Sequence, residues 1–423
     1  MSAIILEGTP VRAGLPTERF RDALVWLMFA SSFVVFIEPA PVDVMFALVL
    51  LTCWRSGLSR TIGAAPLAVL LIVYNLGGFL SYIPVVGADL AGQFVITSTY
   101  MAVMGIVISY YVSYDPVRRF NIIKSGFIVG AVIASIIGLM DFMNILVPIV
   151  RHGQIPGRAT GMFKDPNVFS TYLILPAIML LQSLMLGTAR RTLFSTLALL
   201  PILASLFLAF SRGAWINFLG AAVLMTFFSF IFNVSLGKRL RIVTFIATSV
   251  LLGAVAFMAL MSIPEIRETF MQRFALIQYY DAGETGRFGN QANSVPMLMV
   301  RPLGFGPHQF HTIFDLDPHN TFLNAFASYG WLGGITYFVL VLSTIIIGFK
   351  TICSKTPWQN AAIAVFCPLL TTFLQGVQID TEHWRHLYWM LGLMWGLFAA
   401  TLQPTATLAV DALLHRQNRA VSA

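Results

Sequence analysis

Charged residues are scarce in this chain of 423 residues, since Asp, Glu, Lys and Arg together make up only 10% of it. A typical soluble domain carries roughly 25%. Hydrophobic residues account for 57%, and the mean hydropathy is +0.80. So little charge leaves no room for a large solvated domain. We therefore interpret residues 1–423 as one polytopic membrane domain of the all-α class.

Cysteine is almost absent as well. The three cysteines, Cys53, Cys353 and Cys367, form no C-x-x-C pair and lie outside the predicted outer loops, so we expect no disulfide framework. The chain has no P-loop and no G-x-G-x-x-G motif after a strand, which argues against a nucleotide cofactor. The net charge of +8 is spread between apolar runs rather than clustered, so it does not indicate a nucleic-acid partner.

Long apolar runs make up most of the chain. A helix needs about 20 apolar residues to cross the hydrocarbon layer of a bilayer. Twelve candidate spans meet or approach this length, at 23–38, 41–54, 64–84, 93–114, 123–146, 167–187, 193–210, 214–233, 242–263, 319–348, 358–375 and 387–403. We therefore predict a helical bundle of about 12 transmembrane helices whose outer surface contacts membrane lipids.

The basic residues set the orientation of these spans. With both termini in the cytoplasm, 17 of the 26 lysines and arginines fall in inner segments, and every inner connection holds at least two. This pattern follows the positive-inside rule. The segment Met1–Arg21 is polar and has no apolar stretch before a cleavage site, so we expect a cytoplasmic tail rather than a signal peptide.

The longest outer segment, residues 264–318, has helical patterns of its own. Ile266, Phe270, Phe274 and Ile277 recur at helical spacing and form one apolar stripe. This stripe predicts a short amphipathic helix lying on the outer leaflet. A second short helix is expected over 288–300.

Two arginines on the predicted outer face are candidates for binding an anion. Arg212 lies in Ser-Arg-Gly-Ala-Trp (211–215), where one span ends and the next begins. A cation at this depth is costly without a partner, and the guanidinium fork together with a helix N-terminus suits a phosphate. The alternative is an interfacial anchor, with Arg212 reaching the headgroups beside Trp215. Arg287, in Thr-Gly-Arg (285–287), is a candidate only as a second cation that binds the same diphosphate.

His319 is the candidate general base, because an unperturbed imidazole pKa near 6.5 suits proton abstraction at neutral pH. It lies in Pro-His-Asn (318–320), and the alternative is an ordinary helix entry in which Asn320 is a cap. Upstream, Arg158 and Lys164 add positive potential to the outer face. Asn167 begins the sixth span, so it is either a helix-entry residue or a substrate contact.

Two H-x-x-H pairs raise the question of a metal, namely His308 with His311 and His383 with His386. Neither pair has an H-E-x-x-H pattern or cysteines beside it. The second pair is flanked by aromatic residues typical of a membrane interface. The sequence therefore predicts no metal site and no cofactor.

At these residues the chain resembles the O-antigen ligase superfamily, which includes O-antigen ligases and related polysaccharide polymerases of bacterial envelopes. The resembling pieces are 160–169 (TGMFKDPNVF), 211–215 (SRGAW), 286–287 (GR) ahead of 302–306 (PLGFG), and 318–323 (PHNTFL) leading to 329–333 (YGWLG). Their order and their predicted side of the membrane also agree with the family.

The resemblance implies a metal-independent, inverting glycosyltransferase of the bacterial inner membrane. The donor would be a glycan on undecaprenyl diphosphate, and the acceptor a sugar hydroxyl on lipid A–core or on a growing polysaccharide. Arg212 and Arg287 would hold the diphosphate, and His319 would activate the acceptor. Arg158, Lys164, Asn167 and Asn320 would be substrate contacts. The alternatives are a multi-pass transporter or flippase of lipid-linked glycans, and a non-catalytic partner of an export complex.

Overall fold

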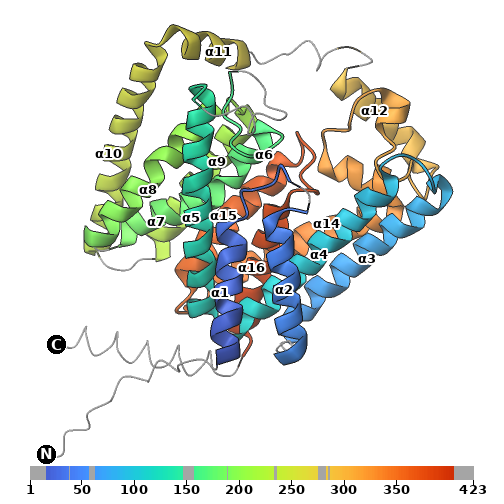
Figure 1. The fold of residues 1–423 in the computed structure, drawn as a ribbon, viewed down its shortest axis with the longest axis horizontal. Helices are drawn as coiled ribbons and strands as arrows, with labels where there is room; N and C mark the ends of the chain where they lie inside the picture. Colours follow the sequence, from blue (N-terminus) through green and yellow to red (C-terminus); the bar gives the residue numbers. More distant parts are fainter. Residues whose placement is uncertain are drawn as a thin grey trace, which may run out of the picture.

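The computed structural model describes residues 16–37, 39–56, 62–145, 157–187, 189–232, 236–274, 283 and 286–403. Every regular element in these ranges is helical (Figure 1). The N-terminal tail before residue 16, the outer loop around Arg151, Ile277 of the apolar stripe and Thr285 lie outside the described residues.

Most of the helices coincide with the predicted spans to within several residues, but the first helix covers Pro16–Ala30, whereas the prediction was 23–38. The helices are α1 (Pro16–Ala30), α2 (Pro41–Ser56), α3 (Ala65–Tyr82), α4 (Ala91–Tyr114), α5 (Pro116–Phe142), α6 (Pro166–Tyr172), α7 (Ile174–Leu186), α8 (Ala189–Leu208), α9 (Arg212–Phe232), α10 (Leu236–Met261), α11 (Pro264–Phe274), α12 (Arg287–Met299), α13 (His311–Phe314), α14 (Thr321–Cys353), α15 (Gln359–Gln375) and α16 (Arg385–Thr401). Short 3-10 turns cover Ile62–Ala64 and Ile83–Val85. Each of the twelve predicted spans falls on one of these helices, with α6 and α7 together forming the sixth.

Seven segments in the described part of the chain are long and apolar enough to cross a membrane, and 41–53 and 192–208 form shorter apolar helices. The exposed apolar surface of α10 indicates that the surrounding medium is apolar. Its consecutive residues Val250, Leu251 and Leu252 are 67%, 65% and 62% exposed, so the helix is bare on several sides. Such a surface is stable only against lipid. The protein is therefore a multi-pass membrane protein.

The core of the bundle is built around α16, most of which is buried. It packs along α4 at close range. A Cβ atom on Gly392 would lie 2.5 Å from the carbonyl oxygen of Gly105, and one on Gly396 would lie 2.6 Å from that of Ser109. Small residues at these positions let the two backbones approach, as is common where helices pack in membranes.

The helix α14 is 33 residues long, or about 50 Å at 1.5 Å per residue, which exceeds the hydrocarbon thickness of about 30 Å. A kink at Gly330, with φ of 63°, divides it. The backbone N–H of Trp331 donates to the carbonyl of Pro302 at 2.8 Å, so the loop before α13 packs into the bend. The kink separates a short part of α14, which follows His319, from a part long enough to cross the bilayer.

Polar contacts define one end of the bundle. Arg118, at the start of α5, pairs with Asp22 of α1, and Gln403 donates to the carbonyl of Ser113 at the end of α4. The beginning of α1 and the end of α16 are therefore on the same side. The helices α11 and α12 lie at the opposite end (Figure 1).

The predicted amphipathic helix is α11, and the predicted second helix is α12. The apolar stripe of α11 packs on protein: Ile266 is 5% exposed, and the ring of Phe270 stacks on Trp215 of α9 at 5.5 Å. The expectation that the stripe lies on lipid therefore needs correction, because the corner formed by α8, α9 and α10 offers an aromatic surface that the sequence did not reveal.

Candidate functional site

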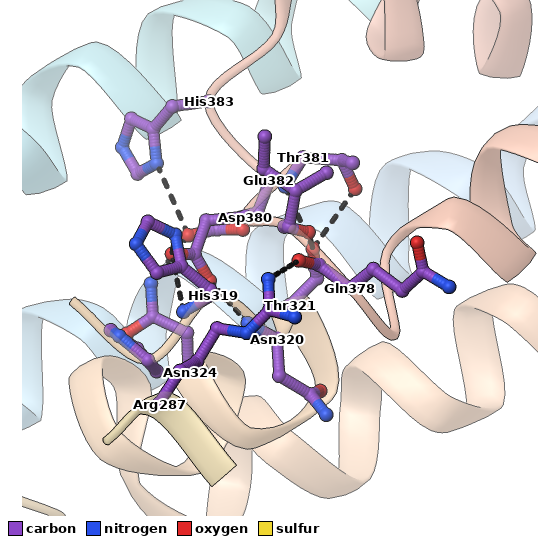
Figure 2. Close-up of polar contacts among 12 residues, drawn as sticks. Arg287, His319, Asn320, Thr321, Asn324, Gln378, Asp380, Thr381, Glu382 and His383 are labelled. Carbon is purple, nitrogen blue, oxygen red and sulfur yellow. Dashed lines mark hydrogen bonds and ion pairs between the residues drawn. The ribbon is translucent and has the colours of Figure 1, made fainter. Parts of the chain in front are cut away.

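The segment 376–384, between α15 and α16, organises the candidate site (Figure 2). The two carboxylate oxygens of Asp380 accept the backbone N–H groups of His319 and Asn320, each at 2.9 Å. The imidazole Nδ1 of His319 lies 3.8 Å from the same carboxylate. Burial and the nearby carboxyl of Glu382 raise the pKa of Asp380, while the two backbone donors act in the opposite direction. One carboxylate thus fixes the backbone at the entry to α14.

His319 has a left-handed backbone, with φ of 47°. This region is unfavourable for a bulky residue and costs about 1–3 kcal/mol, so surrounding contacts must hold it. The bonds from Asp380 supply that restraint, together with the amide of Gln291, which donates to the carbonyl of Pro318 at 2.7 Å. Strain of this kind is frequent at functional positions.

Arg287 is the first residue of α12 and lies beside the same segment. Its Nη1 donates to the carbonyl of Gln378 at 3.3 Å, two residues before Asp380, and the guanidinium lies 4.7 Å from the ring centre of Phe288. Gln291, one turn along α12, contacts Pro318. The structure therefore brings Arg287 and His319 together on one segment (Figure 2).

Arg212 occupies the first turn of α9, where Ser211 is the cap. The Ser211 hydroxyl accepts the N–H of Ala214 at 3.4 Å, and Phe210 before it has a φ of 48°. On the next turn, Asn217 donates to the side chain of Gln375 at 2.6 Å. The start of α9 therefore adjoins the end of α15, from which the segment 376–384 departs. Arg212 therefore lies at the same end of the bundle as His319.

Arg158 and Asn167 support this corner. The buried guanidinium of Arg158 donates to the carbonyls of Ala209 and Phe210 at 2.7 and 3.3 Å, and to the Asn167 side chain at 3.2 Å. Their observed contacts hold the turn that presents Arg212. Asn320 has a similar structural contact, because its side chain accepts the N–H of Leu323 at 3.1 Å and caps α14. The helix-entry alternative is therefore seen for Asn320.

Lys164 is exposed and lines a pocket of about 190 Å³ near the N-terminus of α6. The remaining lining residues come from the segment after α1, from α6 and α16, and from the segments before these two helices: Ser32, Val35, Phe163, Asp165, Val168, Tyr172, His383, Trp384, Arg385, His386 and Trp389. Aromatic faces next to a few hydrogen-bonding groups are typical of small-molecule pockets. His383 connects this pocket to the site, since its Nδ1 lies 3.9 Å from Glu382.

The sequence did not point to Asp380 or Glu382. Glu382 is 2% exposed and accepts a hydrogen bond from Asn324 of α14. Thr321 adds further bonds, to the carbonyl of Ile379 and to Thr381, each at 3.0 Å. The available signal was the stretch Gln-Ile-Asp-Thr-Glu (378–382), which places two carboxylates between the last two predicted spans.

Comparison with known proteins gives one family match. Residues 197–338 match the model of a family described as O-antigen ligase. No curated protein matches. The matched range contains Arg212, Arg287 and His319, while Arg158, Lys164 and Asp380 lie outside it. The chain is thus a multi-pass membrane protein in which residues 197–338 are similar to the O-antigen ligase family.

Proposed function

We propose that this protein is a glycosyltransferase that moves a glycan from undecaprenyl diphosphate to a sugar hydroxyl on the periplasmic face of the bacterial inner membrane. The family match supports transfer of a lipid-linked glycan. The observation that carries the proposal is the segment 376–384, on which Asp380 holds His319 in a left-handed conformation and Gln378 receives Arg287.

The reaction is a single displacement at the anomeric carbon. The acceptor hydroxyl forms the new C–O bond as the bond between that carbon and the diphosphate oxygen breaks, and attack from the opposite face inverts the configuration. The imidazole of His319 takes the hydroxyl proton. The bonding electrons leave with undecaprenyl diphosphate, so atoms and charge balance without a further reactant.

Arg212 and Arg287 stabilise the negative charge that grows on the leaving diphosphate. Each guanidinium can hold two phosphate oxygens at once. The N-terminus of α9 adds a favourable dipole beside Arg212. Charge stabilisation by two preplaced cations lets the proposed displacement proceed without a metal ion in the reaction.

The remaining predicted site residues have two kinds of role. Two of them, Arg158 and Asn167, position the backbone before Arg212. Asn320 positions the backbone after His319. Lys164, with the aromatic residues of its pocket, contacts a sugar of the donor or acceptor. A hydroxyl on lipid A–core and a hydroxyl on a growing polysaccharide are the two acceptors that suit this chemistry.

The proposed topology has twelve crossings in one domain over residues 1–423, with 264–318 in the periplasm and both termini in the cytoplasm. The helices α15 and α16 have 17 residues each, which is close to the minimum for crossing, and lie largely inside the bundle. The shared side of the α1 start and the α16 end supports an even number of crossings.

The test is transfer in proteoliposomes that contain the purified protein, a donor of undecaprenyl diphosphate bearing a labelled glycan, and one acceptor at a time. We expect a new glycosidic bond with wild-type protein. His319→Ala, Arg212→Ala and Arg287→Ala should each lower the rate by about 10²-fold or more, the range for loss of a charge-stabilising or proton-transferring group.

Arg301→Ala is the matched control, because Arg301 is an exposed arginine of the same outer segment. It should keep wild-type activity. Translocation of the donor with no new bond would overturn the proposal in favour of a flippase, and full activity in all three site variants would overturn the assignment of residues. The acceptor that supports transfer distinguishes ligase from polymerase.

A further inference from the structure

The loop between α12 and α14 brings together three side chains that the proposed reaction does not use. His308, His311 and Asp317 each offer a ligand atom, and these atoms lie within 4.8 Å of one another. The ring centres of the two histidines are 4.6 Å apart. Neighbouring ligands of a tetrahedral zinc ion with bonds of 2.0–2.2 Å are separated by about 3.3 Å, so small side-chain rotations close the difference.

The backbone of this loop is shaped to make the cluster. His308 has a φ of 56°, and Asp315 has a φ of 56° at the end of α13. These two left-handed residues reverse the chain and return Asp317 toward the histidines. Such conformations cost free energy in a non-glycine residue, so the loop gains from a ligand that holds them.

Neighbouring contacts restrain the two imidazoles. The ring of His308 stacks on Phe94, with 5.6 Å between the ring centres. Within the described residues, Nδ1 of His311 is buried and has no hydrogen-bond partner.

We propose that His308, His311 and Asp317 bind a divalent transition metal, of which zinc is the best match, and that this ion restrains the loop. Two imidazoles and one carboxylate are a common zinc ligand set, and a water molecule would complete four-coordination. Asp317 lies two residues before His319, so the metal restrains the chain as it enters the candidate site. The sequence had predicted no metal here, because the pair lacks an H-E-x-x-H pattern and neighbouring cysteines, and Asp317 follows His311 by six residues.

The location also explains what the metal would stabilise. The loop is already attached to α14 near its start, where the N–H groups of Phe305 and Gly306 donate to the carbonyl of Ala327 at 2.8 and 3.1 Å. A metal bound by side chains within residues 308–317 would restrain the remaining part of the loop. The inference is independent of glycan transfer, because binding of an ion to this cluster needs no donor or acceptor.

The test measures zinc binding to the full-length protein in detergent. The protein is treated with a chelator, exchanged into metal-free buffer, and titrated with zinc by calorimetry, with bound metal counted by elemental analysis. We expect one zinc ion per chain and a raised melting temperature. His308→Asn, His311→Ala and Asp317→Asn should each weaken binding by about tenfold or more, at least as much as loss of a supporting contact does.

His308→Asn is chosen because asparagine tolerates a left-handed backbone. Asp315→Asn is the matched control: it alters an acidic residue of the same loop outside the ligand set and should bind zinc as the wild type does. Absence of zinc binding in the folded wild-type protein, or unchanged binding in all three ligand variants, would overturn the proposal. Neither result affects glycan transfer, which is measured separately.

Discussion

The replacement Asp380→Asn tests whether the carboxylate positions His319. Asp380 accepts two backbone N–H groups with its two oxygens, each at 2.9 Å. Asparagine has a single acceptor oxygen, and its NH₂ group would face the second N–H donor. The variant therefore loses one hydrogen bond to a charged acceptor, worth about 1.5–3 kcal/mol.

This loss is comparable to the cost of about 1–3 kcal/mol for holding His319 in its left-handed conformation. The native turn would then no longer be strongly favoured. If transfer requires that turn, the rate falls in proportion to its population. At 1.36 kcal/mol per tenfold change, we expect kcat to decrease by about 10- to 100-fold.

The assay is glycan transfer in proteoliposomes over a range of donor and acceptor concentrations, with thermal unfolding measured on the same preparations. A positioning role predicts a fall in kcat with KM changed by less than about threefold, since the substrate contacts remain. The prediction fails if Asp380→Asn keeps wild-type kcat. It also fails if Asp315→Asn, which alters an acidic residue outside these contacts, lowers kcat equally.

Three further predictions concern stability and topology. Arg158→Met should lower the melting temperature and reduce transfer with it, because the carbonyls of the Arg212 corner lose a charged donor worth about 1.5–3 kcal/mol; wild-type stability and activity would contradict this role. Gly330→Ala should destabilise the protein by more than about 1 kcal/mol, because its φ is 63° and a Cβ would lie 2.5 Å from the carbonyl oxygen of Pro302. Gly253→Ala in α10 is its control, since a Cβ there meets nothing within 4 Å and the change should be neutral or slightly stabilising in thermal unfolding. The exposed Cys353, at the end of α14, should react with a membrane-impermeant maleimide in inside-out vesicles and stay unlabelled in intact spheroplasts; the reverse pattern would invert the proposed orientation.

The helices were readable from sequence because hydropathy alone specifies them in a membrane. Hydropathy did not reveal the bend in α14, since Gly330 sits inside a continuous apolar run from 319 to 348. The bend depends on the loop carbonyl of Pro302, which approaches from another part of the chain. The helix over 264–274 was predictable from the spacing of its apolar residues. The surface on which it packs was not, because that surface includes Trp215 of another helix.

The candidate site was predictable where a residue type has a chemical meaning by itself. Arg212, Arg287 and His319 stood out as charged or titratable groups between or at the ends of the membrane-spanning runs. Asp380 did not, because its contacts to His319 and Asn320 join residues about 60 positions apart. Arg158 was singled out only as a source of positive potential, and the structure shows that its guanidinium donates to backbone carbonyls of the turn before Arg212.

The stacking of Phe270 on Trp215 connects the short helix α11 to the start of α9. Trp215 is three residues after Arg212, so α11 rests within one helical turn of that arginine. The indole N–H of Trp215 also donates to the carbonyl of Leu206 at 3.2 Å, which ties the ring to the end of α8. Displacement of α11 would therefore uncover the indole and remove a packing contact from the first turn of α9, next to Arg212.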